Sequence, residues 1–181
     1  GESMTIDGST GDIVVSPSNS QISALKRKQT KIEDQIKWFT ESKYRKLGVE
    51  FRVNVGSLEE INAFSHPFLN SIGLFRSEFI YLDNSTIPTL EQQSKVLEEI
   101  TKKFTGTIVY RTLDIGGDKQ VDYLNLPIEE NPFLGIRGIR LSLVDCNKAS
   151  LGNLDLFESQ VKSILTSESL ERIKIMFPMI S

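Results

Sequence analysis

The 181-residue sequence contains one cysteine, Cys146, and one histidine, His66. A single cysteine excludes an internal disulfide bond and a cysteine-rich metal site. The formal net charge is only −3, which argues against a general nucleic-acid-binding protein. The sequence has no apolar run of about 20 residues, the length that a membrane helix needs. Its first residues lack a basic segment followed by an apolar core, so we expect no secretory signal there.

The first 50 residues predict a hairpin and a helix. Two short apolar segments, residues 4–6 and 13–15, flank a stretch dense in turn formers. A lone hairpin is marginal in water, so we expect it to belong to a sheet with further strands elsewhere. Residues 20–44 carry apolar residues at seven-residue spacing, which predicts a long connecting helix. Its basic run, residues 26–28, fits a solvated helix face better than a nucleic-acid patch.

From residue 48 onward, strand and helix patterns alternate. The strands are predicted at residues 51–56, 71–79, 107–110 and 172–180, and the main helices after Ser57, at 89–104 and at 154–165. This alternation predicts an α/β fold with a parallel sheet, as in a (β/α)8 barrel. Four strands do not close an eight-stranded barrel, so we expect about half of one, in a truncated chain.

Charged residues gather where two of these strands end. Arg76 and Glu78 come late in the second strand, where alternation predicts one face shared with Ile72 and Leu74. A buried arginine needs a partner, so Arg76 is expected to pair with Glu78 or with a ligand anion. Catalytic groups of a β/α barrel lie at the carboxyl ends of its strands.

The third strand leads into residues 111–119, with the sequence RTLDIGGDK. Its paired glycines can let backbone amides approach a ligand closely, and Arg111 and Lys119 bring two positive charges. This combination favours an anion site, with phosphate as the first anion to consider. The alternative is a surface turn in which Arg111 forms a salt bridge with Asp114.

Four segments stand out, in this order: residues 73–79 (GLFRSEF), 111–119, 130–140 (ENPFLGIRGIR) and 175–180 (IMFPMI), with Pro88-Thr89 before a helix rich in Glu and Gln. Together they resemble enzyme I of the phosphoenolpyruvate:sugar phosphotransferase system. The resemblance implies three parts. Residues 1–19 would be the last hairpin of a swivelling phosphohistidine domain, 20–47 a linker helix, and 48–181 the first half of a phosphoenolpyruvate-binding TIM barrel.

The resemblance also implies an activity. Such enzymes bind phosphoenolpyruvate and Mg²⁺ and pass the phosphoryl group to their own histidine. From there it goes to the histidine-containing phosphocarrier protein for sugar uptake. They are cytoplasmic homodimers. By matching motifs, Arg76 and Arg111 would bind the phosphate of phosphoenolpyruvate. Arg137 would be a third cation at the same site, Lys119 a supporting one, and Asn54 would line the mouth of the barrel.

Some features depart from the family pattern. Ser77 replaces a threonine, which keeps the hydroxyl group. The phosphorylated histidine, the Mg²⁺ ligands and the catalytic cysteine would all lie outside this chain, since His66 and Cys146 match no motif. We therefore expect no catalytic residue and no metal ligand here, and no activity of the chain alone.

Three alternative assignments of the protein stay open at this point. The first is a phosphoenolpyruvate synthase or pyruvate phosphate dikinase, although residues 115–119 favour enzyme I. A nitrogen-regulatory paralogue is another. A non-catalytic binding module is a third, because an open sheet edge invites pairing. The same open half barrel predicts self-association of the isolated chain.

Overall fold

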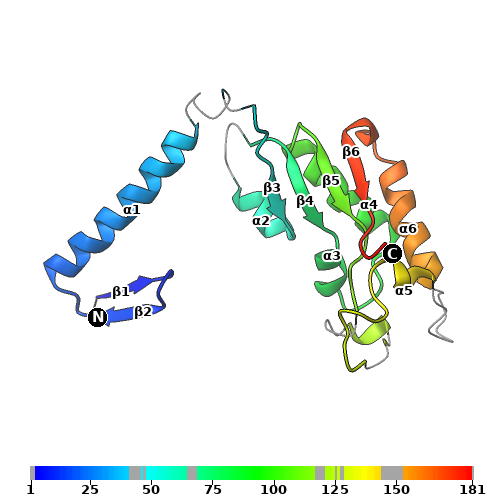
Figure 1. Ribbon diagram of the computed structural model, residues 1–181, viewed down its shortest axis with the longest axis horizontal. Coiled ribbons are helices and arrows are strands. Elements are labelled where there is room, and N and C mark those ends of the chain that lie inside the picture. Colours follow the sequence, from blue (N-terminus) through cyan, green and yellow to red (C-terminus); the bar gives the residue numbers. More distant parts are fainter. Residues whose placement is uncertain are drawn as a thin grey trace. The chain divides into compact units, whose positions relative to one another are not determined.

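The computed structural model describes residues 3–40, 46, 48–64, 69–116, 121–124, 126, 129–143 and 153–180. The chain divides into two compact units, Gly1–Glu50 and Phe51–Ser181 (Figure 1). His66, Lys119 and Cys146 lie outside the described residues.

The first unit is a hairpin followed by a helix, as predicted. Strand β1 (Met4–Asp7) pairs antiparallel with β2 (Asp12–Val15), and helix α1 covers Asn19–Thr40. At the turn, the amide of Gly11 donates to the Asp7 carbonyl at 2.8 Å. Lys28 of α1 donates to the Asp7 carboxylate at 2.7 Å. The expected solvated face of α1 therefore includes one lysine that ties the helix to the hairpin.

The second unit holds a four-stranded parallel sheet in the order β3-β4-β5-β6 (Figure 1). This confirms the predicted parallel sheet and is compatible with part of an α/β barrel. Its elements, in order, are β3 (Val53–Val55), α2 (Leu58–Ala63), β4 (Ile72–Arg76), α3 (Glu78–Leu82), α4 (Leu90–Lys103), β5 (Ile108–Arg111), η2 (Asp122–Leu124), α5 (Ile139–Leu143), α6 (Asn153–Leu165), η3 (Leu170–Arg172) and β6 (Ile173–Met176).

Side-chain caps explain where two of these helices begin. The Ser57 hydroxyl accepts a hydrogen bond from the Glu60 amide at 3.1 Å, at the predicted start of α2. The Glu60 carboxylate accepts from the Gly56 amide at 2.7 Å, one residue before the expected capping-box partner. At α4, Thr89 and Gln92 form a complete capping box.

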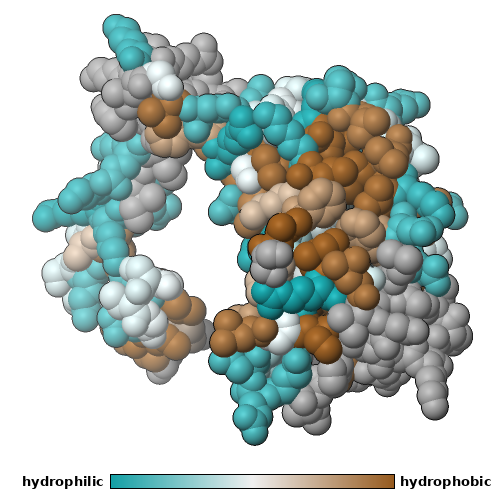
Figure 2. All heavy atoms as spheres, turned by 45° about the vertical axis from the view of Figure 1, so that its right-hand side comes forward, coloured by the Kyte–Doolittle hydropathy of each residue, from teal (hydrophilic) through white to brown (hydrophobic). Residues whose placement is uncertain are grey.

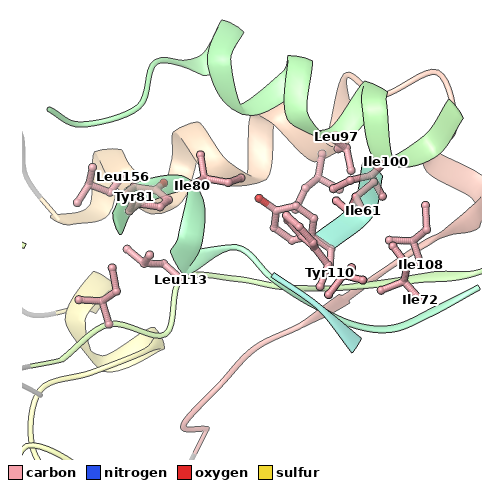
Figure 3. Packing of buried hydrophobic residues seen from close by; sticks show 14 of the residues in the cluster. Ile61, Ile72, Ile80, Tyr81, Leu97, Ile100, Ile108, Tyr110, Leu113 and Leu156 are labelled. Atoms are coloured by element: carbon pink, nitrogen blue, oxygen red, sulfur yellow. The ribbon is translucent and has the colours of Figure 1, made fainter. Parts of the chain in front are cut away.

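The core lies between one face of the sheet and the helices. Figure 3 shows side chains of α2 and α4 gathered against strand residues that alternate along β5. The residues labelled there and less than 2% exposed are Ile61, Ile72, Tyr81, Leu97, Ile100, Ile108 and Tyr110. Because Ile108 and Tyr110 are buried against the helices, the alternation of β5 sends Arg111 to the opposite face.

One expectation about β4 is wrong. The strand ends at Arg76, and Glu78 is the first residue of helix α3. Ile72 and Phe75 are both buried, and the pairing register of β4 with β5 shifts between them. Simple alternation therefore does not hold, and Ile72, Leu74, Arg76 and Glu78 do not share one strand face.

Hydrophobic side chains are exposed in this unit. Figure 2 shows hydrophobic atoms in a broad patch on the unit that carries the sheet. Three exposed residues at and beyond the end of β6 are Met176, Phe177 and Ile180. Within the described part of the chain, no helix has both the length and the apolar character for crossing a membrane.

Candidate functional site

Arg76 and Arg111 are the last residues of two neighbouring parallel strands. Arg76 ends β4, Arg111 ends β5, and the two are partners in the pairing register. Side chains at paired positions of parallel strands point to the same face. The sheet therefore places two guanidinium groups side by side at its carboxyl-terminal edge.

Arg111 is held by two carboxylates. Its Nη2 lies 2.5 Å from Glu78 Oε1, and its Nη1 lies 3.0 Å from Asp114 Oδ2. Glu78 is 1% exposed and Asp114 is 9% exposed. Buried carboxylates are costly unless paired, so these contacts fix both the acids and the orientation of the guanidinium.

Of the two partners expected for Arg76, Glu78 is not the one, because Glu78 turns into α3 and contacts Arg111, and a ligand anion stays a prediction. Arg76 Nη2 lies 3.7 Å from Glu60 Oε2, and the guanidinium carbon lies 4.8 Å from the centre of the Phe79 ring. Arg76 Nε is buried and has no hydrogen-bond partner among the residues that the structure describes. Arg111 Nε likewise lacks such a partner, so the two arginines differ in their ion pairs, of which that of Arg76 is the longer and the more exposed.

Gly56, at the end of β3, comes close to the same side chains. A Cβ atom there would lie 2.5 Å from the Phe79 ring and 3.1 Å from Arg76 Nη2. A larger residue would push both groups away. Glycine at this position therefore leaves room for the contact between Arg76 and Phe79.

Asp114 brings in the third predicted cation. Arg137 Nε donates to Asp114 Oδ1 at 3.1 Å, and the Arg137 guanidinium carbon lies 5.0 Å from the centre of the Phe133 ring. Arg137 is 6% exposed. Asp114 therefore bridges Arg111 and Arg137, which are 26 positions apart in the sequence.

The backbone next to Arg137 is fixed from two sides. Gly138 has a φ of +58°, which favours glycine, and its amide donates to the Ile115 carbonyl at 3.3 Å. The Ile139 amide donates to the Pro178 carbonyl at 3.2 Å. These bonds hold the Arg137 segment between the segments that follow β5 and β6.

The alternative interpretation of residues 111–119 was a surface turn with an Arg111–Asp114 salt bridge. That salt bridge is present, but the segment around it is buried: Leu113 is 8% exposed and Ile115 is 0% exposed. The surface-turn interpretation is therefore wrong for residues 111–116. Lys119 lies in the part of this segment that the structure does not describe.

Asn54 lies lower on the sheet than the arginines. It is an exposed residue of β3 and pairs with Leu74, two residues before Arg76. A Cβ atom on Gly73 would lie 3.6 Å from Asn54 Oδ1, so the amide lies over the Gly73 position. The described geometry therefore brings three of the five predicted residues into one cluster and leaves Asn54 beside it.

Sequence reasoning missed two of the groups that shape this cluster. The Glu78–Arg111 pair depends on the helical turn after β4. One signal was available, since Glu78 is followed by a hydrophobic run, residues 79–82, in which a carboxylate is expected to be buried and paired. The sequence also contained no indication that the Phe79 ring would lie against the Arg76 guanidinium.

The carboxylates of the cluster do not fit a Mg²⁺ site. Mg²⁺ prefers oxygen ligands with near-octahedral geometry. Glu78 and Asp114 are both already occupied by guanidinium groups. Among the described residues, no three His, Cys, Asp or Glu side chains are placed to share a metal ion.

The cluster is suited to an anion. Three guanidinium groups face two buried carboxylates, which leaves an excess of positive charge, and Glu60 offsets it only from a half-exposed position. Guanidinium groups offer forked donors that match phosphate oxygens. The least constrained donors belong to Arg76.

Comparison with known proteins agrees with this chemistry. Residues 26–181 match the family described as "PEP-utilising enzyme, PEP-binding domain". The chain belongs to this family. The match begins inside α1 and contains the whole sheet unit.

Three curated relatives of this family member are named phosphoenolpyruvate-protein phosphotransferase. The protein from Priestia megaterium is 34% identical over 97% of the chain, the one from Staphylococcus aureus strain MSSA476 is 34% identical over 100%, and the one from Bacillus subtilis is 32% identical over 100%. The chain spans 30% to 32% of the length of these relatives. The resemblance to this family of phosphotransferases is therefore confirmed.

Proposed function

We propose that the chain is part of a phosphoenolpyruvate-protein phosphotransferase, in which Arg76 and Arg111 hold the phosphate of phosphoenolpyruvate. The observation that carries this proposal is the register of β4 and β5, which puts the two arginines side by side at the carboxyl edge of a parallel sheet. The family match and the names of the relatives supply the substrate class.

The contacts of the three arginines suggest a different role for each in binding the phosphate. Phosphoryl transfer depends mainly on positioning and on neutralising charge. Arg111, clamped by Glu78 and Asp114, presents a fixed fork of donors. Arg76, held by a single longer ion pair, can turn toward the phosphate without breaking a buried ion pair. Arg137 adds a third positive charge through Asp114.

Other parts of the proposal follow from the resemblance. Lys119 supports the phosphate site and Asn54 lines its mouth. The phosphoryl group goes to a histidine of the swivelling domain and then to the histidine-containing phosphocarrier protein. Mg²⁺ supplies further charge neutralisation when bound, through ligands outside this chain. The full enzyme is a cytoplasmic homodimer that serves sugar uptake. Residues 1–19 form the last hairpin of its swivelling domain, and residues 48–181 form the first half of its TIM barrel.

A synthase or dikinase remains the alternative within the same family. The relatives named phosphotransferase favour the first assignment. ATP-dependent formation or use of phosphoenolpyruvate by the full-length protein would reverse the choice.

Single substitutions in the full-length enzyme test the assigned roles. Arg76→Ala and Arg111→Ala should each slow phosphorylation from phosphoenolpyruvate by about 100-fold or more, since loss of one charged donor costs a few kcal/mol of barrier. Arg27→Ala, on the exposed surface of α1, serves as the matched control. The readout is pyruvate release. Near-normal rates in both site variants would refute the proposal.

A further inference from the structure

A buried glutamine links the two strand ends that carry the arginines. Gln160 lies in the middle of α6 and is 1% exposed. Its Nε2 donates to Ser77 Oγ at 3.0 Å, and its Oε1 accepts from the Leu113 amide at 2.8 Å. One carboxamide therefore bonds to the segment after β4 and to the segment after β5.

The two bonded residues stand next to the ion pairs of the cluster. Ser77 lies between Arg76 and Glu78, and it is 0% exposed. Leu113 directly precedes Asp114. A shift of either contact would move a residue that holds Arg111, or move Arg76 itself.

The chemistry of the link requires an amide. A carboxamide offers a donor and an acceptor on one head group, and both are used here. A methionine of similar length offers neither, and would leave the buried Leu113 amide and the Ser77 hydroxyl without this partner. Gln160 makes no hydrogen bond to an arginine among the described contacts, and its bonds to Ser77 and Leu113 connect it to the residues beside the arginines and their partners.

We infer that Gln160 is a positioning residue, which sets the spacing of the β4 and β5 ends so that Arg76 and Arg111 fit one phosphate group. The inference rests on the proposed function. It assigns to α6, a helix on the far side of the sheet from the arginines, a part in substrate binding. It also gives Ser77 a role, as the hydroxyl that receives the Gln160 amide.

A second buried glutamine provides a matched control. Gln93 is also 1% exposed, and its Nε2 donates to the Pro88 carbonyl and to Ser159 Oγ at 3.1 and 3.2 Å. Its Oε1 accepts from the Tyr81 hydroxyl at 3.3 Å. None of these contacts falls on the residue that follows β4 or on the segment that follows β5.

The experiment compares Gln160→Met with Gln93→Met in the full-length enzyme. Both should lower the midpoint of thermal unfolding, because each leaves buried polar groups unpaired. Only Gln160→Met should raise KM for phosphoenolpyruvate, by about tenfold, since small misplacements of binding groups are costly. An unchanged KM in Gln160→Met, or an equal rise in both variants, would overturn the inference.

Two further variants keep the result interpretable. Ser77→Ala removes the acceptor hydroxyl with no added bulk and should raise KM in the same direction. If Gln160→Met does not fold, an unchanged KM in Ser77→Ala overturns the inference. Normal kinetics in Arg76→Ala and Arg111→Ala would instead show that the proposed function has failed, whereas impaired arginine variants with a normal Gln160→Met would reject only the role of Gln160.

Discussion

Glu78→Gln offers a direct test of the ion-pair cluster, because it removes one charge and keeps the shape of the side chain. Glu78 is 1% exposed, and its partner Arg111 retains 17% side-chain exposure. Breaking a buried pair costs about 3–5 kcal/mol when it leaves a charge without compensation. Arg111 keeps Asp114 at 3.0 Å, and glutamine still offers a carbonyl oxygen, so we expect a smaller loss of about 2 kcal/mol.

The assay is urea unfolding of the chain at pH 7, followed by far-UV circular dichroism. Glu158→Gln is the matched control, because Glu158 pairs with Lys162 at 3.3 Å on the exposed surface of α6. Exposed pairs contribute about 0–1 kcal/mol. The destabilisation by Glu78→Gln should also persist in 0.5 M salt, since buried pairs are screened much less than exposed ones.

The reasoning has a clear point of failure. If Glu78→Gln costs no more stability than Glu158→Gln, or if its effect disappears in salt, then Glu78 is not a buried partner of Arg111. The ion pair that orients the Arg111 guanidinium would then be absent. The proposal that Arg111 donates to the phosphate from a fixed orientation would lose its basis.

Three other predictions concern the chain as a whole. Burial raises the pKa of Tyr123 to about 12, and it raises the pKa values of Tyr81 and Tyr110 further. The stability that these neutral phenols contribute is therefore present below pH ~10 and lost as the pH rises toward 12. Absorbance at 295 nm with circular dichroism should show phenol ionisation coupled to unfolding, and ionisation of all three near pH 10 in a folded chain would contradict this. Exposed Met176 and Phe177 predict concentration-dependent self-association, which light scattering after size exclusion measures; a monomer at all concentrations would refute it. The isolated chain should not cleave phosphoenolpyruvate, and sustained pyruvate release from pure chain would reject that expectation.

Local patterns in the sequence were sufficient for the parallel sheet, for the starts of two helices and for the pair of arginines. Ser57 and Thr89 begin helices because their hydroxyl groups cap backbone amides nearby in the sequence. The adjacency of Arg76 and Arg111 follows from two parallel strands that end in arginine, which needs no knowledge of side-chain contacts. These features are local or depend only on strand order.

The contacts that orient the arginines required the three-dimensional structure. The end of β4 at Arg76 could not be read from alternation, so Glu78 was assigned to the wrong partner. Gln160 bonds to Ser77, 83 positions away, and no local rule links such residues. One signal did exist, because Gln160 lies four residues from Leu156 and four from Ile164, on the buried stripe of α6. A polar residue on that stripe must find partners inside the protein.

The bond between the Ile139 amide and the Pro178 carbonyl bears on how this domain can be cut for experiments. A shortened version ending before Pro178 would retain all four strands, because β6 ends at Met176. It would also retain the neighbouring arginines of β4 and β5. It would lose one of the two backbone hydrogen bonds that hold the segment next to Arg137, so the third guanidinium would be held less firmly beside Asp114. The smallest piece that preserves the sheet is therefore shorter than the smallest piece that preserves the cluster.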